Sequence, residues 1–218
     1  MGKIIRIVII IILAVLLALG GFQWRNYHKK SQYRENALLY FKEKDYQKSV
    51  DYLEKGLKQM SVFGDDMDED MSCYLAESYY QLGEYEQASQ VYDGLLDKNP
   101  GEQKYFLLKA EALIALGSRQ EAISLYEKGW EETGSTVFLR EICDCYIEEK
   151  EYEKALDYAR MGVEAEKGDS PAFLFKEIVI YEKCNDYQAA YEAALEYTTR
   201  YPEDEKGQRE LKFLETRI

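Results

Sequence analysis

The sequence has few of the residues that most catalytic and metal sites require. Among 218 residues there is one histidine, His28, and there are four cysteines, none of them in a CxxC pair: Cys73, Cys143, Cys145 and Cys184. The body of the chain therefore offers no histidine for a serine–histidine–aspartate arrangement. The GxxxxGK[ST] phosphate loop is also absent. We expect a protein that is not an enzyme and that uses no cofactor and no metal, with its cysteines serving as small core residues.

Proline is scarce too, with three residues, whereas there are twenty tyrosines. No stretch shows sustained alternation of apolar and polar residues, which is the pattern of a half-buried strand. Few prolines and many alanine, leucine, glutamate and lysine residues favour helix. The sequence therefore predicts an all-α fold, and its hydrophobic content of 46% is sufficient for a packed core.

The chain is acidic, with a net charge of −13. The first basic residues, Lys3 and Arg6, precede the first acid, Glu35, and without these two the remaining chain carries −15. A body this acidic cannot bind nucleic acid through a general phosphate-neutralising surface. We expect instead a protein or peptide partner that carries basic residues.

The N-terminal segment differs from the rest in having thirteen consecutive apolar residues, Ile7 to Leu19. A membrane-spanning helix needs about twenty apolar residues, and aromatic and basic residues follow at once, as they do at a membrane interface. We predict a membrane anchor over residues 1–25, with Arg25, Lys29 and Lys30 on its flank. Its anchoring residues are Ile7, Leu13, Leu17, Trp24 and Tyr27.

A cleaved signal peptide is the competing interpretation, because Ala18-Leu19-Gly20 has the small-x-small pattern of a cleavage site. The protein would then be secreted. As a single-pass membrane protein, the chain would place its body outside the cytoplasm if the short N-terminal tail stays inside. Unpaired thiols favour the opposite, reducing side, so a body facing the cytoplasm stays open.

The body of the chain repeats itself at intervals close to 34 residues. The clearest copies read "LGEYEQASQVYDGLLDKNP" and "LGSRQEAISLYEKGW". The repeats align, at spacings of 39, 34, 33 and 35, on Tyr46, Tyr85, Arg119, Tyr152 and Tyr187. A small residue follows three places later, at Ser49, Ala88, Ala122, Ala155 and Ala190. Four residues further on stand Leu53, Tyr92, Tyr126, Ala159 and Ala194. Upstream, a small or apolar residue recurs at Ala37, Ala76, Ala110, Cys143 and Ile178.

These residues resemble the tetratricopeptide repeat (TPR) family, in which each repeat is a pair of antiparallel helices. The resemblance implies a right-handed α-solenoid over residues 30–203, with repeats at about 30–61, 69–102, 103–135, 136–169 and 171–203. Three repeats depart from the pattern, because Lys44, Lys150 and Asn185 replace the turn glycine. We predict a capping helix over residues 204–218, with an apolar stripe of Leu211, Leu214 and Ile218.

By the same resemblance, a partner segment would bind in a concave groove lined by the first helix of each repeat. The predicted groove residues are Arg34, Leu38, Tyr74, Glu77, Tyr80, Leu107, Glu111, Arg140, Asp144, Phe175 and Val179. Glu77, Glu111 and Asp144 share one motif position and predict a row of acids for a segment with basic and apolar side chains. The alternative is that these acids are only solvated.

The resemblance thus implies a membrane-tethered interaction adaptor or scaffold. The alternatives are a self-associating scaffold and a secreted TPR protein. Family members that bind terminal carboxylates use a basic clamp, and Leu38, Tyr74 and Glu77 in the corresponding places disfavour one.

One acidic stretch has nearly the spacing of a calcium-binding EF-hand loop, with Asp66, Asp68, Asp70 and Glu77 at the ligand positions. Such a loop needs glycine at its sixth position, where this sequence has Met71. The repeat register also predicts a continuous helix from Asp70 to Leu82, so that Glu77 cannot fold back on Asp66. We therefore expect no calcium site, and we expect the acids to complement the N-terminus of a helix.

Overall fold

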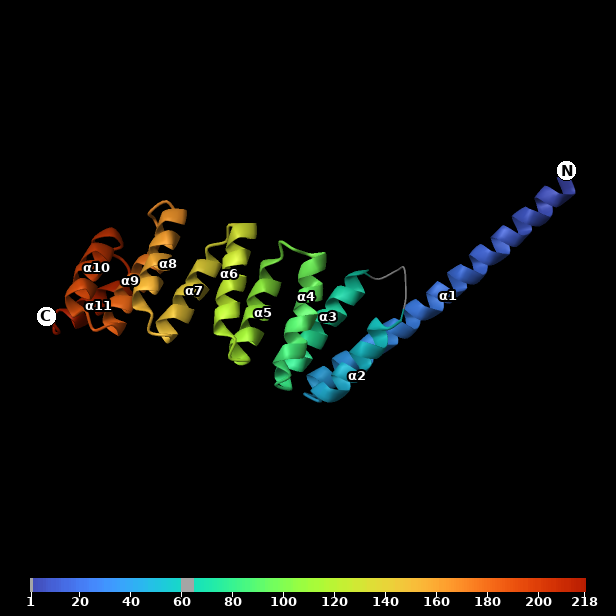
Figure 1. The fold of residues 1–218 in the computed structure, drawn as a ribbon, viewed down its shortest axis with the longest axis horizontal. Coiled ribbons are helices and arrows are strands. Elements are labelled where there is room, and N and C mark those ends of the chain that lie inside the picture. Colours follow the sequence, from blue (N-terminus) through green and yellow to red (C-terminus); the bar gives the residue numbers. More distant parts are fainter. Residues whose placement is uncertain (1, 60–64) are drawn as a thin grey trace. The chain divides into compact units, whose positions relative to one another are not determined.

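The computed structural model describes residues 2–59 and 65–218, and all regular elements in these residues are α-helices (Figure 1). This confirms the predicted all-α fold. The helices are α1 (Gly2–Lys42), α2 (Tyr46–Leu57), α3 (Asp65–Gln81), α4 (Tyr85–Lys98), α5 (Gln103–Ala115), α6 (Arg119–Thr133), α7 (Val137–Glu148), α8 (Tyr152–Ala165), α9 (Pro171–Lys183), α10 (Tyr187–Arg200) and α11 (Glu205–Leu214).

The helices form two compact units, Met1–Pro100 and Gly101–Ile218. In unit 1, α1 packs against α2, α2 against α3, and α3 against α4. In unit 2, each helix from α5 to α11 packs against the next. Both units are therefore stacks of helix hairpins. We call the first helix of each hairpin the A helix (α1, α3, α5, α7, α9) and the second the B helix (α2, α4, α6, α8, α10).

The five B helices begin at the five residues on which the sequence repeats align, from Tyr46 to Tyr187. Two residues before each start, the backbone is left-handed, with φ between 61° and 86°. The residues in this conformation are Lys44, Gly83, Gly117, Lys150 and Asn185. At two of the turns an aspartate caps the B helix, since Asp45 accepts from Lys48 N and Asp186 from Ala189 N. The repeated turn thus fixes where every B helix starts.

The residues that recur at the small and apolar motif positions form the core. All fifteen are at most 2% exposed. Small side chains at these positions let the two helices of a hairpin approach closely. The burial confirms the repeat register read from the sequence.

In two B helices of unit 2, a glycine makes close contact with the next hairpin. In unit 2, the ring of Phe138 on α7 lies against Gly129 of α6, and a Cβ on this glycine would be 2.7 Å from the ring. Gly162 of α8 and Phe173 of α9 repeat the arrangement at 2.4 Å. Each glycine leaves room for an aromatic ring directly on the helix backbone.

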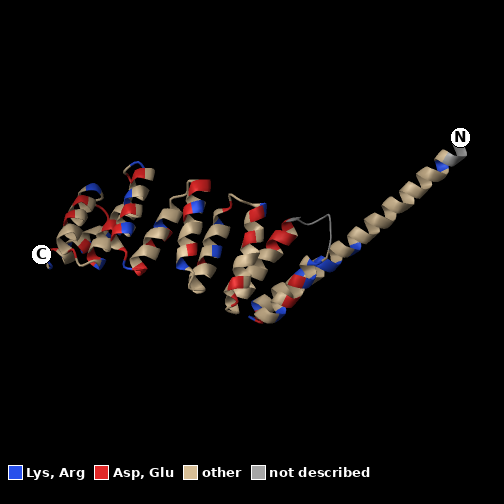
Figure 2. Cartoon of the chain, viewed as in Figure 1, with Lys and Arg blue, Asp and Glu red and all other residues tan. Residues whose placement is uncertain are grey.

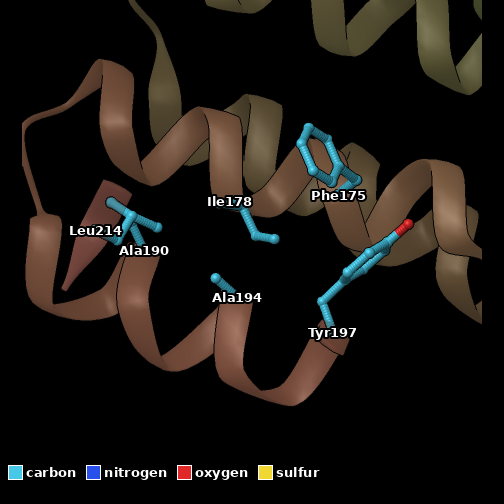
Figure 3. Packing of buried hydrophobic residues seen from close by; sticks show 6 residues of the cluster. All are labelled: Phe175, Ile178, Ala190, Ala194, Tyr197 and Leu214. Carbon is cyan, nitrogen blue, oxygen red and sulfur yellow. The ribbon is translucent and has the colours of Figure 1, made fainter. Parts of the chain in front are cut away.

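The end of unit 2 is closed by α11. A buried cluster joins α9, α10 and α11, and Figure 3 shows its side chains directed toward one another: Phe175, Ile178, Ala190, Ala194, Tyr197 and Leu214. Leu211 packs against this cluster as predicted. The prediction for Ile218 was wrong, because α11 ends at Leu214 and Ile218 is 58% exposed.

Helix α1 joins the apolar N-terminal segment to the first hairpin without a break (Figure 1). No interruption occurs between residues 25 and 30, where the sequence suggested a boundary. The helix is long and apolar enough to cross a membrane, with a mean hydropathy of 2.9 over its most apolar window, and that window is not buried in the protein. A signal sequence near the N-terminus would meet the same criteria. Ile7, Leu13, Leu17 and Trp24 are all more than half exposed, and Tyr27 is half-buried.

Two ion pairs hold the beginning of α3 against α1. Lys30 Nζ lies 2.5 Å from Asp68 Oδ1, and Arg34 Nε lies 2.6 Å from Asp70 Oδ2. Lys30 is 1% exposed. Lys30, which we expected on the flank of the anchor, is therefore paired with the acidic start of α3. Two of the acids that resembled a calcium loop bind basic side chains instead.

Candidate partner-binding face

The predicted groove residues lie on the A helices, and we consider them unit by unit. In unit 1, all five are half-exposed: Arg34, Leu38, Tyr74, Glu77 and Tyr80. In unit 2, Glu111, Arg140 and Asp144 are exposed, Leu107 and Val179 are half-exposed, and Phe175 is buried. We call these side chains, without Phe175, the A-helix face of each unit.

The A-helix face of unit 1 is rich in aromatic rings. Phe41 meets Tyr74 edge to face, with ring centroids 5.1 Å apart, and it meets Tyr46 at 5.4 Å. In the hairpin of α3 and α4, the ring centroids of Tyr80 and Tyr85 lie 5.2 Å apart. Edge-to-face pairs of this kind hold rings in fixed orientations. Unit 1 thus presents ordered, half-exposed rings beside Leu38.

Arg34 is already bound at the edge of this aromatic surface. Its hydrogen bond to Asp70 raises the pKa of the Arg34 guanidinium above the usual value. Glu77 accepts a hydrogen bond from Gln81 Nε2 at 2.8 Å, one turn along α3. The carboxylate of Glu77 therefore keeps capacity for a further donor, since an ionised carboxylate has about four lone-pair sites.

In unit 2, the acidic positions are occupied by Glu111 on α5 and Asp144 on α7. Asp144 Oδ1 lies 2.6 Å from Lys176 Nζ on α9, and the Asp144 side chain is 51% exposed. Lys176, which the sequence did not point to, is 14% exposed. Next to Asp144 on the same helix, Arg140 approaches Glu141 at 3.6 Å. The aspartate thus fixes α9 against α7 and still faces solvent.

The last A helix contributes less to the face than the sequence suggested. Phe175 packs in the cluster with Tyr197 and is covered by Lys206, whose Nζ lies 3.9 Å from the ring centroid. Val179 packs against the same cluster. Burial raises the pKa of Glu177, and burial together with a hydrogen bond to Glu210 raises that of Glu182 to about 7. The fifth hairpin mainly closes the core.

The cysteines differ from one another in exposure. Cys143 and Cys145 are buried, as expected for core residues, and burial raises their pKa values to about 12 and about 11. They are therefore thiols rather than nucleophilic thiolates at neutral pH. The expectation was wrong for Cys184, which is exposed, and Cys73 is half-buried. None of the four cysteines forms a disulfide.

Among residues 2–59 and 65–218, no three histidine, cysteine, aspartate or glutamate side chains gather as metal ligands would. His28 lies beside Trp24 and Tyr27 on α1, with ring centroids 4.3 and 6.1 Å away. The arrangement on the A helices is suited to contacting another chain through rings, apolar side chains and carboxylates.

Comparison with known proteins identifies the fold. A family model described as anaphase-promoting complex, cyclosome, subunit 3, matches residues 61–129, about a third of the chain. No curated protein matches the chain.

Solved structures of tetratricopeptide repeat proteins resemble it over most of its length. One from Parabacteroides merdae has a TM-score of 0.62 at 13% identity and covers 87% of this chain and 73% of its own. A TPR protein from Bacteroides fragilis has a TM-score of 0.55 at 14% identity, and the match covers 87% of this chain and 99% of its own. YrrB, described as a TPR protein with an unusual peptide-binding site, has a TM-score of 0.52 at 15% identity. The match covers 83% of this chain and 90% of YrrB. These similarities show the tetratricopeptide fold.

Proposed function

Starting from its tetratricopeptide fold, we propose that this chain is an interaction scaffold, held at a membrane by α1, that binds partner segments on the A-helix faces of its units. The proposal is of a binding protein without catalytic activity. The proposal is supported by the exposed and half-exposed rings, apolar side chains and carboxylates of the A helices, which are not part of the buried core. YrrB, which shares the fold, is described as having a peptide-binding site.

The chemistry of these faces indicates partner segments with basic and apolar side chains. The rings around Phe41 and Tyr74 can take up apolar groups and can lie against cations. Glu77, Glu111 and Asp144 supply negative charge at equivalent positions of three hairpins. A partner with a terminal carboxylate is disfavoured because Arg34 is already paired with Asp70. Charge complementarity of this kind contributes mainly to specificity and association rate.

The proposal is tested by measuring peptide affinity with the acids removed. The full-length chain carrying Glu77→Gln, Glu111→Gln and Asp144→Asn is compared with the wild type for binding of fluorescent peptides that alternate lysine with leucine. The three losses together are expected to weaken binding about tenfold, because each exposed charge pair contributes about 0.5 kcal/mol. Asparagine at position 144 keeps the oxygen that Lys176 contacts.

A matched control removes the same charge from the B helices of the same three hairpins. Glu86, Glu121 and Asp157 are exposed on α4, α6 and α8, so Glu86→Gln, Glu121→Gln and Asp157→Asn change net charge equally. The control is expected to bind the peptides nearly as the wild type does. If both triple variants lost affinity to the same extent, binding would reflect net charge and the A-helix faces would not be the sites.

A further inference from the structure

The charge of the chain is divided between the first hairpin and the rest. Residues 1–58 contain eleven basic and five acidic residues, which gives a net charge of +6. Residues 59–218 contain seventeen basic and thirty-six acidic residues, which gives a net charge of −19. Figure 2 shows basic residues, in blue, concentrated where α2 ends beside α1. The acidic protein thus has one basic region, at the hairpin that carries the apolar helix.

Helix α2 runs back along α1 toward the apolar segment. In the middle of α2, the Tyr52 ring stacks on that of Tyr40 with centroids 5.4 Å apart, and the Tyr33 ring lies 6.3 Å from it. Near the end of α2, a Cβ on Gly56 would lie 3.2 Å from Tyr33 Cβ. Lys55 and Lys58, on either side of Gly56, are therefore on the end of the hairpin that faces the apolar segment.

The basic residues of this region have two different uses. Lys30 and Arg34 bind Asp68 and Asp70 of α3. Arg25 and Lys29 are exposed, and in the described part of the chain they contact the rings of Phe22 and Tyr33 on their own helix and no carboxylate. The cations that α3 does not neutralise are thus the ones nearest the apolar segment.

Lys55 of α2 and Lys58, which caps the C-terminus of α2, are also exposed. Lys55 lies over the Tyr52 ring at 5.3 Å. Lys58 lies 3.1 Å from Glu54, whose other oxygen accepts a hydrogen bond from Tyr79. The Lys58 side chain is 74% exposed, so this surface pair leaves the ammonium group largely in solvent.

We propose that Arg25, Lys29, Lys55 and Lys58 form a basic collar that binds the anionic lipid headgroups of the membrane from which α1 emerges. This rests on the proposed membrane crossing of α1. With Trp24 at the interface, the helical rise puts Lys29 about 8 Å and Tyr33 about 14 Å further along α1. Lysine side chains at these levels reach within about one Debye length, roughly 8–10 Å, of the headgroups. The acidic remainder of the chain would be repelled by the same surface.

The chain carries its own reporter for this test. It has two tryptophans, Trp24 and Trp130, so Trp130→Phe leaves Trp24 as the only one, at the level of the collar. The full-length protein is reconstituted in mixed phosphatidylcholine and phosphatidylglycerol vesicles of one composition, in which either the neutral or the anionic lipid carries the bromine quencher. We expect the brominated anionic lipid to quench Trp24 more strongly.

Matched double variants locate the source of that preference. Lys55→Gln with Lys58→Gln is expected to reduce the preference for the anionic lipid by about threefold or more, since each basic residue near an anionic surface adds to the attraction. Lys42→Gln with Lys44→Gln makes the same charge change at the other end of the hairpin and is expected to leave the preference unchanged. Adding Arg25→Gln and Lys29→Gln to the first pair should abolish it.

The outcomes separate the collar from the membrane crossing. Equal quenching by both lipids in the wild type, or equal losses in the two double variants, would overturn the collar while Trp24 still reports an inserted helix. If neither lipid quenched Trp24, α1 would not be in the bilayer, and the proposed tethering would fail with it.

Discussion

At the scale of single residues, the turns inside the hairpins carry backbone strain that three repeats do not relieve. Gly83 and Gly117 have positive φ at no steric cost, whereas Lys44 and Lys150 adopt φ 61° with a full side chain. Asn185 does the same, but asparagine tolerates this region better than lysine does. A left-handed lysine costs about 1–2 kcal/mol relative to the right-handed conformation.

We therefore expect Lys150→Gly to stabilise the protein by about 0.5–1 kcal/mol, because relief of the strain exceeds the extra entropy that glycine loses on folding. The measurement is the melting temperature, which should rise by about 2 °C in a chain of this size. Gly117→Ala is the reciprocal change. No atom lies within 4 Å of the added Cβ, so its expected loss of stability would come from the backbone alone. A lower melting temperature for Lys150→Gly would contradict the assignment of strain.

At the scale of elements, the stacking of unit 2 depends on how α6 and α8 each pack against the A helix that follows. The Phe138 ring lies on the backbone of α6 at Gly129, and the Phe173 ring lies on α8 at Gly162. The contact joins residues nine and eleven positions apart, yet it recurs because the repeat does. A methyl group on either glycine would overlap with an aromatic ring rather than with a flexible chain end.

Gly129→Ala is accordingly expected to destabilise the protein by about 1–3 kcal/mol, which is typical of overpacking in a core. Gly94 offers a matched control, because it lies in the exposed interior of α4 and an added Cβ meets nothing within 4 Å. Gly94→Ala should stabilise by about 0.5–1 kcal/mol through helix propensity. Chemical denaturation of both variants checks the pair, and a loss of stability at position 94 equal to that at 129 would refute the packing explanation.

The starts of the B helices could be read from the sequence because the turn and the small residue after it are local signals. The burial of Lys30 could not, since its partner Asp68 lies 38 positions away and the longer first spacing obscures the register. The continuity of α1 was also missed, because the sequence analysis ended the anchor at residue 25 and began the first repeat at residue 30, yet one helix spans both. Phe175 was placed on the face although the last hairpin needs it for the core.

At the scale of the whole molecule, three features stand together in one chain: an apolar helix, a basic hairpin that continues it, and acidic hairpins beyond. Length and composition make α1 suitable for crossing a membrane. The positive charge is concentrated beside that helix and the negative charge in residues 59–218. We infer a division of tasks, in which the first hairpin contacts lipid and the acidic hairpins receive a basic partner.

The central claim, that a partner binds the A helices of a membrane-held scaffold, is tested most directly by photo-crosslinking of the full-length chain in intact membranes. A photoreactive residue replaces Arg140 on α7, whose side chain is 45% exposed. As a control of similar exposure, it replaces Leu195 on α10, which is 47% exposed. We predict a discrete adduct from position 140 in the membrane fraction, with a basic partner segment identified by mass spectrometry. An adduct from position 195 alone, or an acidic segment crosslinked at position 140, would contradict the claim.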